Sequence, residues 1–419
     1  MSRRAPIGRL IAGVAASLLL VSACGTPGSS TATTTTSTPA AGSSGSAGTS
    51  APAATGDPVK VGIVTSLSGP LQSYGQIYLD AFTAGIDYAT NGTGIVNGHK
   101  IEVQTADDAA DPAKATSTVT DLIGKGYKII AGTASSGVAL QVAPLAADNQ
   151  VLFISGPAAS DAITGVNKYT FRSGRQTYQD TLTAASFLGD LQGKKVTVFT
   201  QDNAFGQNNV GAVTKVFGAG GATITPQLVA ANATDLVGFA KQAADAKADL
   251  LFVAWAGTNA TQMWDSLNQQ GAFASPTTVV TGLDIKASHP VLAPVAGNIS
   301  LLAHYFDGAT DNAVEKAMVS GLTKAGKTQD LFSPDGFNAA LMVAHAVEGA
   351  PDDVDGMIAA LEGWKFDGPK GAMEIRASDH ALLQPMFQAK LVDTNGTLTP
   401  QLVKALTPDL TTPPESPFK

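Results

Sequence analysis

Small hydroxyl residues stand at the end of the first strand-like run of the chain, where they could bind the polar group of a ligand. The run 59–64 is apolar and rich in β-branched residues, which is typical of a strand buried in a parallel sheet. Ser66, Ser68 and Gly69 follow it and supply hydroxyls and open backbone amides. Open α/β sheets bind ligands at the carboxyl ends of their strands. The segment predicts either the first loop of a binding cleft or an ordinary strand-to-helix turn opened by Pro70.

Side chains that would support catalysis or metal binding lack the necessary spacing. The histidines are scattered along the chain, at His99, His289, His304, His345 and His380. Metal sites place such ligands at short, regular intervals. Neither a Gly-x-Ser-x-Gly nucleophile elbow nor a P-loop occurs, and the glycines at 218–221 follow a helical pattern, which predicts a helix end. We therefore expect no enzyme, metal or cofactor, and a secreted hydrolase is the alternative.

The size and charge of the chain restrict its class. A chain of 419 residues is longer than one hydrophobic core usually supports, so two lobes are expected. Hydrophobic residues make up 44% of it, which is enough for sizeable cores. The formal net charge of -8 argues against nucleic acid or an anionic membrane surface as a partner of the folded part.

The N-terminus is typical of a bacterial lipoprotein. Three arginines precede an apolar run at 10–21 that is too short to span a membrane, so 1–23 is predicted to be a signal peptide. Residues 21–24, Val-Ser-Ala-Cys, resemble the lipobox, which implies that Cys24 is lipidated after cleavage; an uncleaved anchor is the alternative. Cys24 is the single cysteine, so no internal disulfide is expected.

A segment of Gly, Ser, Thr, Ala and Pro connects this cysteine to the globular part. The segment 24–56 has too few apolar residues to fold, so it predicts a flexible tether. The expected location is the outer face of the cytoplasmic membrane, held by the lipid and without a transmembrane helix.

Strand-like and helical patterns alternate through the rest of the chain, which is typical of parallel sheets. The first unit has strands at 60–65, 100–105, 128–131, 151–155 and 168–173, with helices at 75–90, 112–125 and 138–149. The second has helices at 177–191, 204–217, 235–246 and 259–270, with strands at 195–200, 223–229, 250–255, 277–281 and 299–305. Helices at 311–325, 334–349 and 353–361 indicate a return to the first unit, and strands at 371–376 and 386–393 follow them near the end of the chain. We expect an α/β fold of two Rossmann-like lobes.

Three motifs carry a family resemblance. They are Gly-Ile-Val-Thr-Ser-Leu-Ser-Gly-Pro at 62–70, Asp107-Asp108 with Asp111-Pro112, and Val-Leu-Phe-Ile-Ser at 151–155. In this order they resemble the Leu/Ile/Val-binding protein family, the type I periplasmic binding proteins of ATP-binding-cassette importers, over residues 58–406. The resemblance implies two lobes with a three-stranded hinge that close on a ligand.

The resemblance also implies domain bounds. The expected first lobe combines 57–174 with 306–380, the second combines 175–305 with 381–410, and 411–419 is a tail.

Site residues of the first lobe follow from the same resemblance. The family binds a carboxylate there with small hydroxyls and backbone amides, which are suitable donors for an anion. Tyr74, Ser136, Ala158, Ala159 and Ser160 fall at the matching positions. Relatives often have threonine where Ala159 stands, so Ser160 would have to replace its hydroxyl. Each serine on its own could equally be a helix cap.

The second lobe and the crossover supply the remaining candidates. Phe205 and Trp255 could pack on a ligand, and Asp284 matches the partner of an amino acid's ammonium group, or else caps a helix. Trp264, nine residues after Trp255, is expected in the core.

Arg172, Gln176 and Tyr178 lie at the expected hinge. Arg172 resembles a residue that the family keeps there, either to brace the hinge or to contact an acidic ligand.

Together these features predict a monomeric solute-binding lipoprotein. It would bind an amino acid, an amide or an aromatic acid and deliver it to the permease subunits of an ATP-binding-cassette importer. A receptor that senses a ligand without transport is the alternative.

Overall fold

The computed structural model describes residues 53–274, 277–293 and 295–418. The predicted signal peptide, Cys24 and nearly all of the tether lie outside these residues. Within the described part, no helix is both long enough and apolar enough to cross a membrane.

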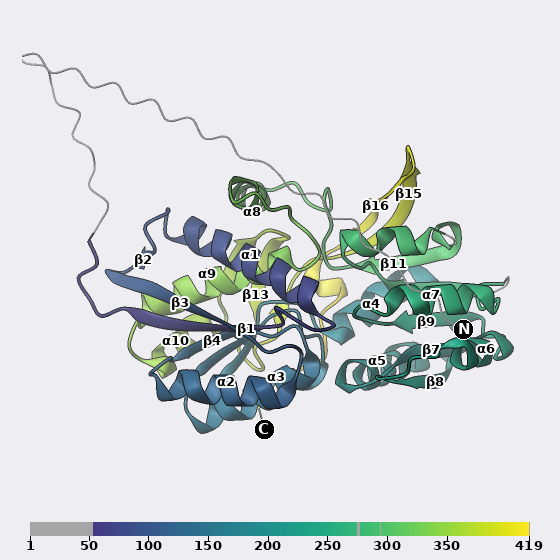
Figure 1. The fold of residues 1–419 in the computed structure, drawn as a ribbon, viewed down its shortest axis with the longest axis horizontal. Helices are drawn as coiled ribbons and strands as arrows, with labels where there is room; N and C mark the ends of the chain where they lie inside the picture. The colour runs from purple at the N-terminus through teal and green to yellow at the C-terminus, as the bar shows by residue number, and fades with distance from the viewer. Residues whose placement is uncertain (1–52, 275–276, 294, 419) are drawn as a thin grey trace, which may run out of the picture. The chain divides into compact units, whose positions relative to one another are not determined.

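The first sheet has six strands in the order β2-β3-β1-β4-β5-β6, all parallel except β2 (Figure 1). The strands are β1 (Val59–Thr65), β2 (Ile95–Val96), β3 (His99–Asp107), β4 (Ile129–Gly132), β5 (Leu152–Ser155) and β6 (Thr170–Arg172). Helices α1 (Gln72–Ala89), α9 (Ser333–Gly349) and α10 (Val354–Leu361) cover one face, and α2 (Pro112–Gly124) and α3 (Ser136–Asp148) cover the other. Helix α8 (Ala313–Lys324) packs outside α1.

The second sheet has seven strands in the order β16-β15-β11-β10-β9-β7-β8. The strands are β7 (Lys195–Asp202), β8 (Thr223–Ala230), β9 (Leu250–Ala254), β10 (Thr278–Gly282), β11 (Ile299–Ala303), β15 (Met386–Thr394) and β16 (Thr397–Leu406). The first five are parallel, and β15 and β16 form an antiparallel hairpin at the edge. Helices α4 (Thr177–Leu188) and α5 (Ala204–Ala219) cover one face, and α6 (Val237–Asp245) and α7 (Ala260–Gln269) cover the other.

The central strands of both sheets are buried on their two faces, as their uniform apolar sequences predict. In β1, Val61 and Ile63 belong to the core beneath α1 and α9, whereas Val64 belongs to the core beneath α2 and α3. In β7 of the second sheet, Phe199 belongs to the core beneath α6 and α7, whereas Val198 belongs to the core beneath α4 and α5. The predicted α/β fold with two parallel-sheet lobes is therefore confirmed.

The chain passes between the two sheets after β6, after β11 and before β15. A small antiparallel sheet of β12 (Lys365–Gly368), β13 (Gly371–Ile375) and β14 (Leu382–Leu383) packs into the first lobe. Because β14 pairs with β13, the third passage begins after Leu383, a few residues later than the sequence predicts.

The C-terminal residues return to the first lobe. Arg376 donates hydrogen bonds to the carbonyls of Pro413 and Pro414, and Asp379 accepts one from the backbone of Ser416. The ring of Phe418 also packs on His380, with ring centroids 4.6 Å apart. The segment predicted as a tail therefore packs against the first lobe through residue 418, which adds a fourth passage after β16. No short-range pattern in the sequence indicated this contact.

Asp107 and Asp108 hold the loop that follows β1. Asp107 accepts hydrogen bonds from the backbones of Leu67 and Ser68, from the Ser68 hydroxyl at 2.6 Å and from Lys114 at 2.8 Å. The Ser66 hydroxyl donates to Asp108 at 2.6 Å. Both serines therefore shape the loop.

The same loop fixes the start of α1. A β-carbon on Gly75 would lie 2.0 Å from the carbonyl oxygen of Ser66, so only glycine permits α1 to approach this closely. Tyr74, the preceding residue, is positioned by this contact.

We predict that Asp107→Asn lowers the free energy of unfolding at pH 7 by about 1–2 kcal/mol, because it weakens several charge-assisted hydrogen bonds. Partial burial acts to raise the pKa of Asp107, but Lys114, Ser68 and two backbone amides hold that pKa well below its usual range. The ionised Asp107 side chain therefore contributes its full stabilisation above about pH 4, the usual pKa of an aspartate. This stabilisation is lost progressively as the pH falls below that value.

Urea unfolding at pH 7 and pH 3 tests this expectation, and the difference between wild type and variant should shrink at pH 3. Asp245→Asn, which removes an exposed helix pair with Lys241, serves as the control and should change stability by less than about 0.5 kcal/mol. A difference that grows on acidification would contradict the assignment.

Candidate functional site

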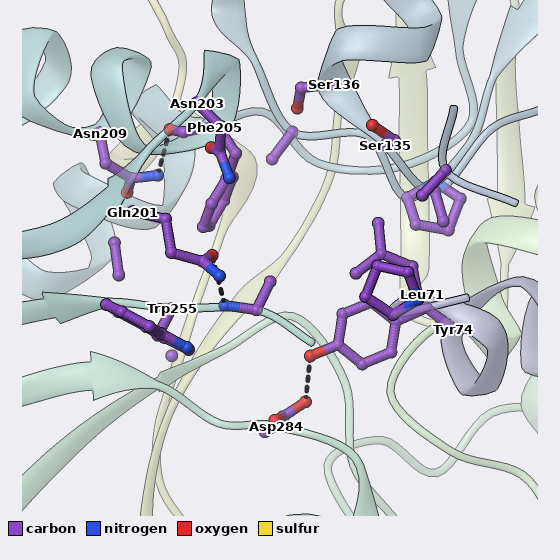
Figure 2. Close-up of a pocket in the computed structure, with 18 of the residues that line it drawn as sticks. Leu71, Tyr74, Ser135, Ser136, Gln201, Asn203, Phe205, Asn209, Trp255 and Asp284 are labelled. Atoms are coloured by element: carbon purple, nitrogen blue, oxygen red, sulfur yellow. Dashed lines mark hydrogen bonds between the residues drawn. The ribbon is translucent and has the colours of Figure 1, made fainter. Parts of the chain in front are cut away.

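Loops at the carboxyl ends of both sheets surround one cavity of about 680 Å³ (Figure 2). Six residues that the sequence placed in a site line it: Tyr74, Ser136, Ala159, Phe205, Trp255 and Asp284. Five others do not: Ala158, Ser160, Arg172, Gln176 and Tyr178. The carboxyl-end rule thus brings the candidates from both lobes to the same place.

The first-lobe wall is formed by the loops after β4 and β5. Ser135 caps α3 by accepting a hydrogen bond from the backbone of Val138 at 3.4 Å. The Ser136 hydroxyl accepts one from the backbone of Ser160 at 3.2 Å, which joins the two loops. Ser160 lies behind the wall, where its own hydroxyl accepts from the backbone of Ala162. The helix-cap alternative therefore holds for Ser160, which caps the short 3-10 helix Asp161–Ile163, whereas Ser136 links two loops.

Tyr74 and Asp284 connect the two lobes across the cavity. The Tyr74 hydroxyl donates to Asp284 Oδ1 at 2.7 Å, and the backbone of Ile285 donates to the same oxygen at 2.7 Å (Figure 2). Burial raises the pKa of Asp284, which the Tyr74 hydrogen bond opposes. Burial and the neighbouring carboxylate also raise the pKa of Tyr74 well above its usual value. Asp284 is therefore an interlobe contact in this structure.

The second-lobe wall combines aromatic rings with carboxamides. Trp255 stacks on Phe199 with ring centroids 5.6 Å apart, and its indole nitrogen donates to Asn259 Oδ1 at 2.9 Å. Phe205 lines the cavity in the first turn of α5, whose N-cap is Asn203. Trp264 is buried in the core, as predicted.

The floor of the cavity contains three titratable residues that the sequence did not place in the site. Arg175 and Asp180 line it from the start of α4, and His304 lines it from the end of β11. The Arg175 Nε lies 3.2 Å from Asp180 Oδ2, and Arg175 Nη1 donates to the carbonyl of Pro157. Burial raises the pKa of Asp180, with Arg175 opposing it, and lowers the pKa of His304 well below its usual value.

The predicted hinge residues lie beneath this floor. Arg172 is 1% exposed and donates to the carbonyls of Ala158, Ser160 and Arg175. The Gln176 side chain accepts from the hydroxyl of Thr164, and the Tyr178 backbone donates to Asp161. Their contacts support the loops of the cavity from behind.

A metal site is not apparent in the described ranges, which hold no cluster of three histidine, cysteine or carboxylate side chains suited to an ion.

Comparison with known proteins identifies the family. The family described as periplasmic binding protein matches residues 58–397, so the chain belongs to it. The Leu/Ile/Val-binding protein BraC3 of Rhizobium johnstonii is 26% identical over 311 residues, which are 67% of this chain and 83% of that protein. The resemblance drawn from the sequence motifs is thus confirmed.

Solved structures agree with this assignment. An ABC-type branched-chain amino acid transporter from Rhodopseudomonas palustris is 30% identical, covers 84% of this chain and 97% of its own, and superimposes with a TM-score of 0.70. A solute binding protein of an ABC transporter from R. palustris BisB5, in complex with 3,4-dihydroxy benzoic acid, is 25% identical, covers 83% and 97%, and has a TM-score of 0.73. The two-lobed fold of this chain is that of type I periplasmic binding proteins.

We predict that Tyr74→Phe lowers the free energy of unfolding by about 1–2 kcal/mol, because it removes a hydrogen bond to a partly buried carboxylate. Urea unfolding measures the change. Tyr88→Phe is the matched control, since Tyr88 is 44% exposed and its hydroxyl makes no hydrogen bond within the described residues. Equal stability of the two variants would mean that the Tyr74 contact does not form in solution.

Proposed function

We propose that this protein is the solute-binding component of an ATP-binding-cassette importer. It takes up a small molecule in the cavity between its lobes and delivers it to the permease subunits. The observation that carries the proposal is the cavity of about 680 Å³ that is lined by strand-end loops of both sheets. Its volume lies within the range of small-molecule sites, roughly 300–1,000 Å³.

The proposed ligands are amino acids, amides and aromatic acids. The R. palustris relatives support this range, because one is described as a branched-chain amino acid transporter and another holds a dihydroxybenzoic acid. The aromatic rings of Phe205 and Trp255 suit an apolar or planar ligand body. Closure of the lobes would exclude water and strengthen the polar contacts.

Site roles follow from the placement of the residues. Tyr74, Ser136 and Ala159 are proposed to contact the ligand from the first lobe, with Asp284 as the partner of an ammonium group. Ala158 and Ser160 act through the loop they belong to. Arg172, Gln176 and Tyr178 brace the hinge.

We further propose that the protein works outside the cytoplasmic membrane as a monomer. Cys24 would carry the lipid, and the segment 24–56 would tether the two lobes to the outer face of the membrane. The domain bounds proposed from the sequence place the hinge at residues near 174, 305 and 380, and the pairing of β14 with β13 moves the third of these to about residue 383.

A sensing receptor without transport would use the same cavity, and only an uptake measurement separates the two. A secreted hydrolase is disfavoured by the family, whose matched relatives are described as binding proteins and transporters.

A ligand panel tests the proposal. We predict that one class among branched-chain, aromatic and polar amino acids, amides and aromatic carboxylates raises the melting temperature. A ligand at a hundredfold excess over its dissociation constant adds about 2.7 kcal/mol of stability. Thermal unfolding followed by calorimetric titration provides the measurement. Turnover of a bound compound would favour the hydrolase, and no stabilisation by any class would contradict the proposal.

The role of Asp284 is tested with the same panel. Asp284→Asn should weaken an amine-bearing ligand at least tenfold, because it removes the charge that faces the ammonium group. Asp311→Asn, at an exposed pair with Lys316, is the control and should leave affinity unchanged. If Asp284→Asn binds amines as tightly as wild type, the ammonium role is wrong.

A further inference from the structure

The carboxamides of the second-lobe wall are held in fixed orientations by the protein. Gln201 Oε1 accepts a hydrogen bond from the backbone of Ala256, Asn203 Oδ1 from the backbone of Gly206, and Asn259 Oδ1 from the indole of Trp255. Each of these donors is an N–H group. Its hydrogen bond can be accepted by the oxygen of the carboxamide but not by the NH₂ group, which is itself a donor. The three NH₂ groups are therefore left for other partners.

These three NH₂ groups have no acceptor in the part of the chain that the structure describes. Gln201, Asn203 and Asn259 all line the cavity, and Gln201 is only 7% exposed. Figure 2 shows Gln201, Asn203 and Trp255 on one side of the cavity, across from Leu71 and Tyr74. None of the three nitrogens is among the fully buried side-chain atoms without a partner, so each is open to the cavity. A ligand that fills the cavity removes water from these donors and must accept their hydrogen bonds in its place.

Asn209 is oriented the opposite way and complements the three donors. Its Nδ2 donates to the carbonyl of Phe205 at 2.9 Å, which leaves its Oδ1 as an acceptor in the same wall. Donors in excess with one acceptor beside them suit a ligand oxygen, such as a hydroxyl, a carbonyl or a carboxylate.

We propose that the second-lobe wall selects ligands that present an oxygen acceptor on the part facing Gln201, Asn203 and Asn259. A ligand with an alkyl group there would desolvate the three donors without replacing their hydrogen bonds. This inference rests on the proposed function and narrows its ligand class: a purely aliphatic amino acid such as leucine is disfavoured against an oxygen-bearing amino acid or a hydroxylated aromatic acid.

Pairs of compounds that differ at one group test the inference by calorimetric titration. The probes are 4-hydroxybenzoate with 4-methylbenzoate, and L-glutamine with L-norleucine. The oxygen-bearing member of the pair that binds should bind at least tenfold more tightly. Equal or tighter binding of the alkyl member in either pair overturns the inference while leaving the proposed function intact. Failure of the whole panel of ligand classes would count against the proposed function instead.

A second arm needs no ligand and compares two asparagine helix caps. Asn203→Asp keeps the oxygen that caps α5 and replaces the free NH₂ group. Asn312→Asp likewise keeps the cap of α8 but loses the hydrogen bond from Asn312 Nδ2 to the carbonyl of Pro369, at 2.9 Å. We expect Asn203→Asp to melt at or above the wild-type temperature, because aspartate is a good N-cap, and Asn312→Asp to melt below it.

The two variants also separate binding from folding. Asn203→Asp should bind the preferred member of the pair at least tenfold more weakly than wild type, whereas Asn312→Asp should bind it with unchanged affinity. If Asn203→Asp lowers the melting temperature as much as Asn312→Asp does, its NH₂ group already has a partner in the protein and the inference is wrong.

Discussion

The cavity depends on the hydrogen bonds that the buried guanidinium group of Arg172 makes with the loops around it. A charge that is removed from water must be compensated by hydrogen bonds, and Arg172 donates to the carbonyls of Ala158, Ser160 and Arg175. Burial lowers the pKa of Arg172 to about 10, while Asp161 opposes the shift, so the side chain stays charged at neutral pH. The loop after β5 and the first passage between the sheets are thereby held together. The contact of Ser160 with Ser136 and the position of Arg175 both follow from it.

The two lobes contribute unlike chemistry to the cavity that this framework supports. The first lobe supplies small residues together with Tyr74 and Phe332, and the second supplies Phe205, Trp255 and oriented carboxamides. Tyr74 reaches Asp284 directly, so the lobes touch at one end of the cavity and leave room elsewhere. Such a division suits a hinged binding protein, because neither lobe alone satisfies a polar ligand.

Local patterns predict most of this fold because the strands are buried on both faces and the helices carry ordinary caps. The helix predicted at 112–125 begins at Pro112 as α2, and Asp111 caps it by accepting hydrogen bonds from the backbones of Ala113 and Lys114. The turn between β15 and β16 is formed by Asn395 and Gly396, which both have positive φ and are residue types that favour such turns. Strand β12 is short and partly polar, and the C-terminal return depends on distant partners, so neither has a signal that a single sequence can reveal.

The same distinction applies to the site. Residues at strand ends, such as Trp255, could be placed by periodicity and resemblance, and they line the cavity. Arg175, His304 and the carboxamides reach it through the packing of the hinge and of the second lobe, which no short-range pattern encodes. The most direct test of the account is a crystal structure of the protein with a compound that raises its melting temperature. Density for that compound is expected between the two sheets, in contact with residues of both lobes, such as Tyr74 and Asn203. Density outside this cavity, or in contact with one lobe alone, would contradict it.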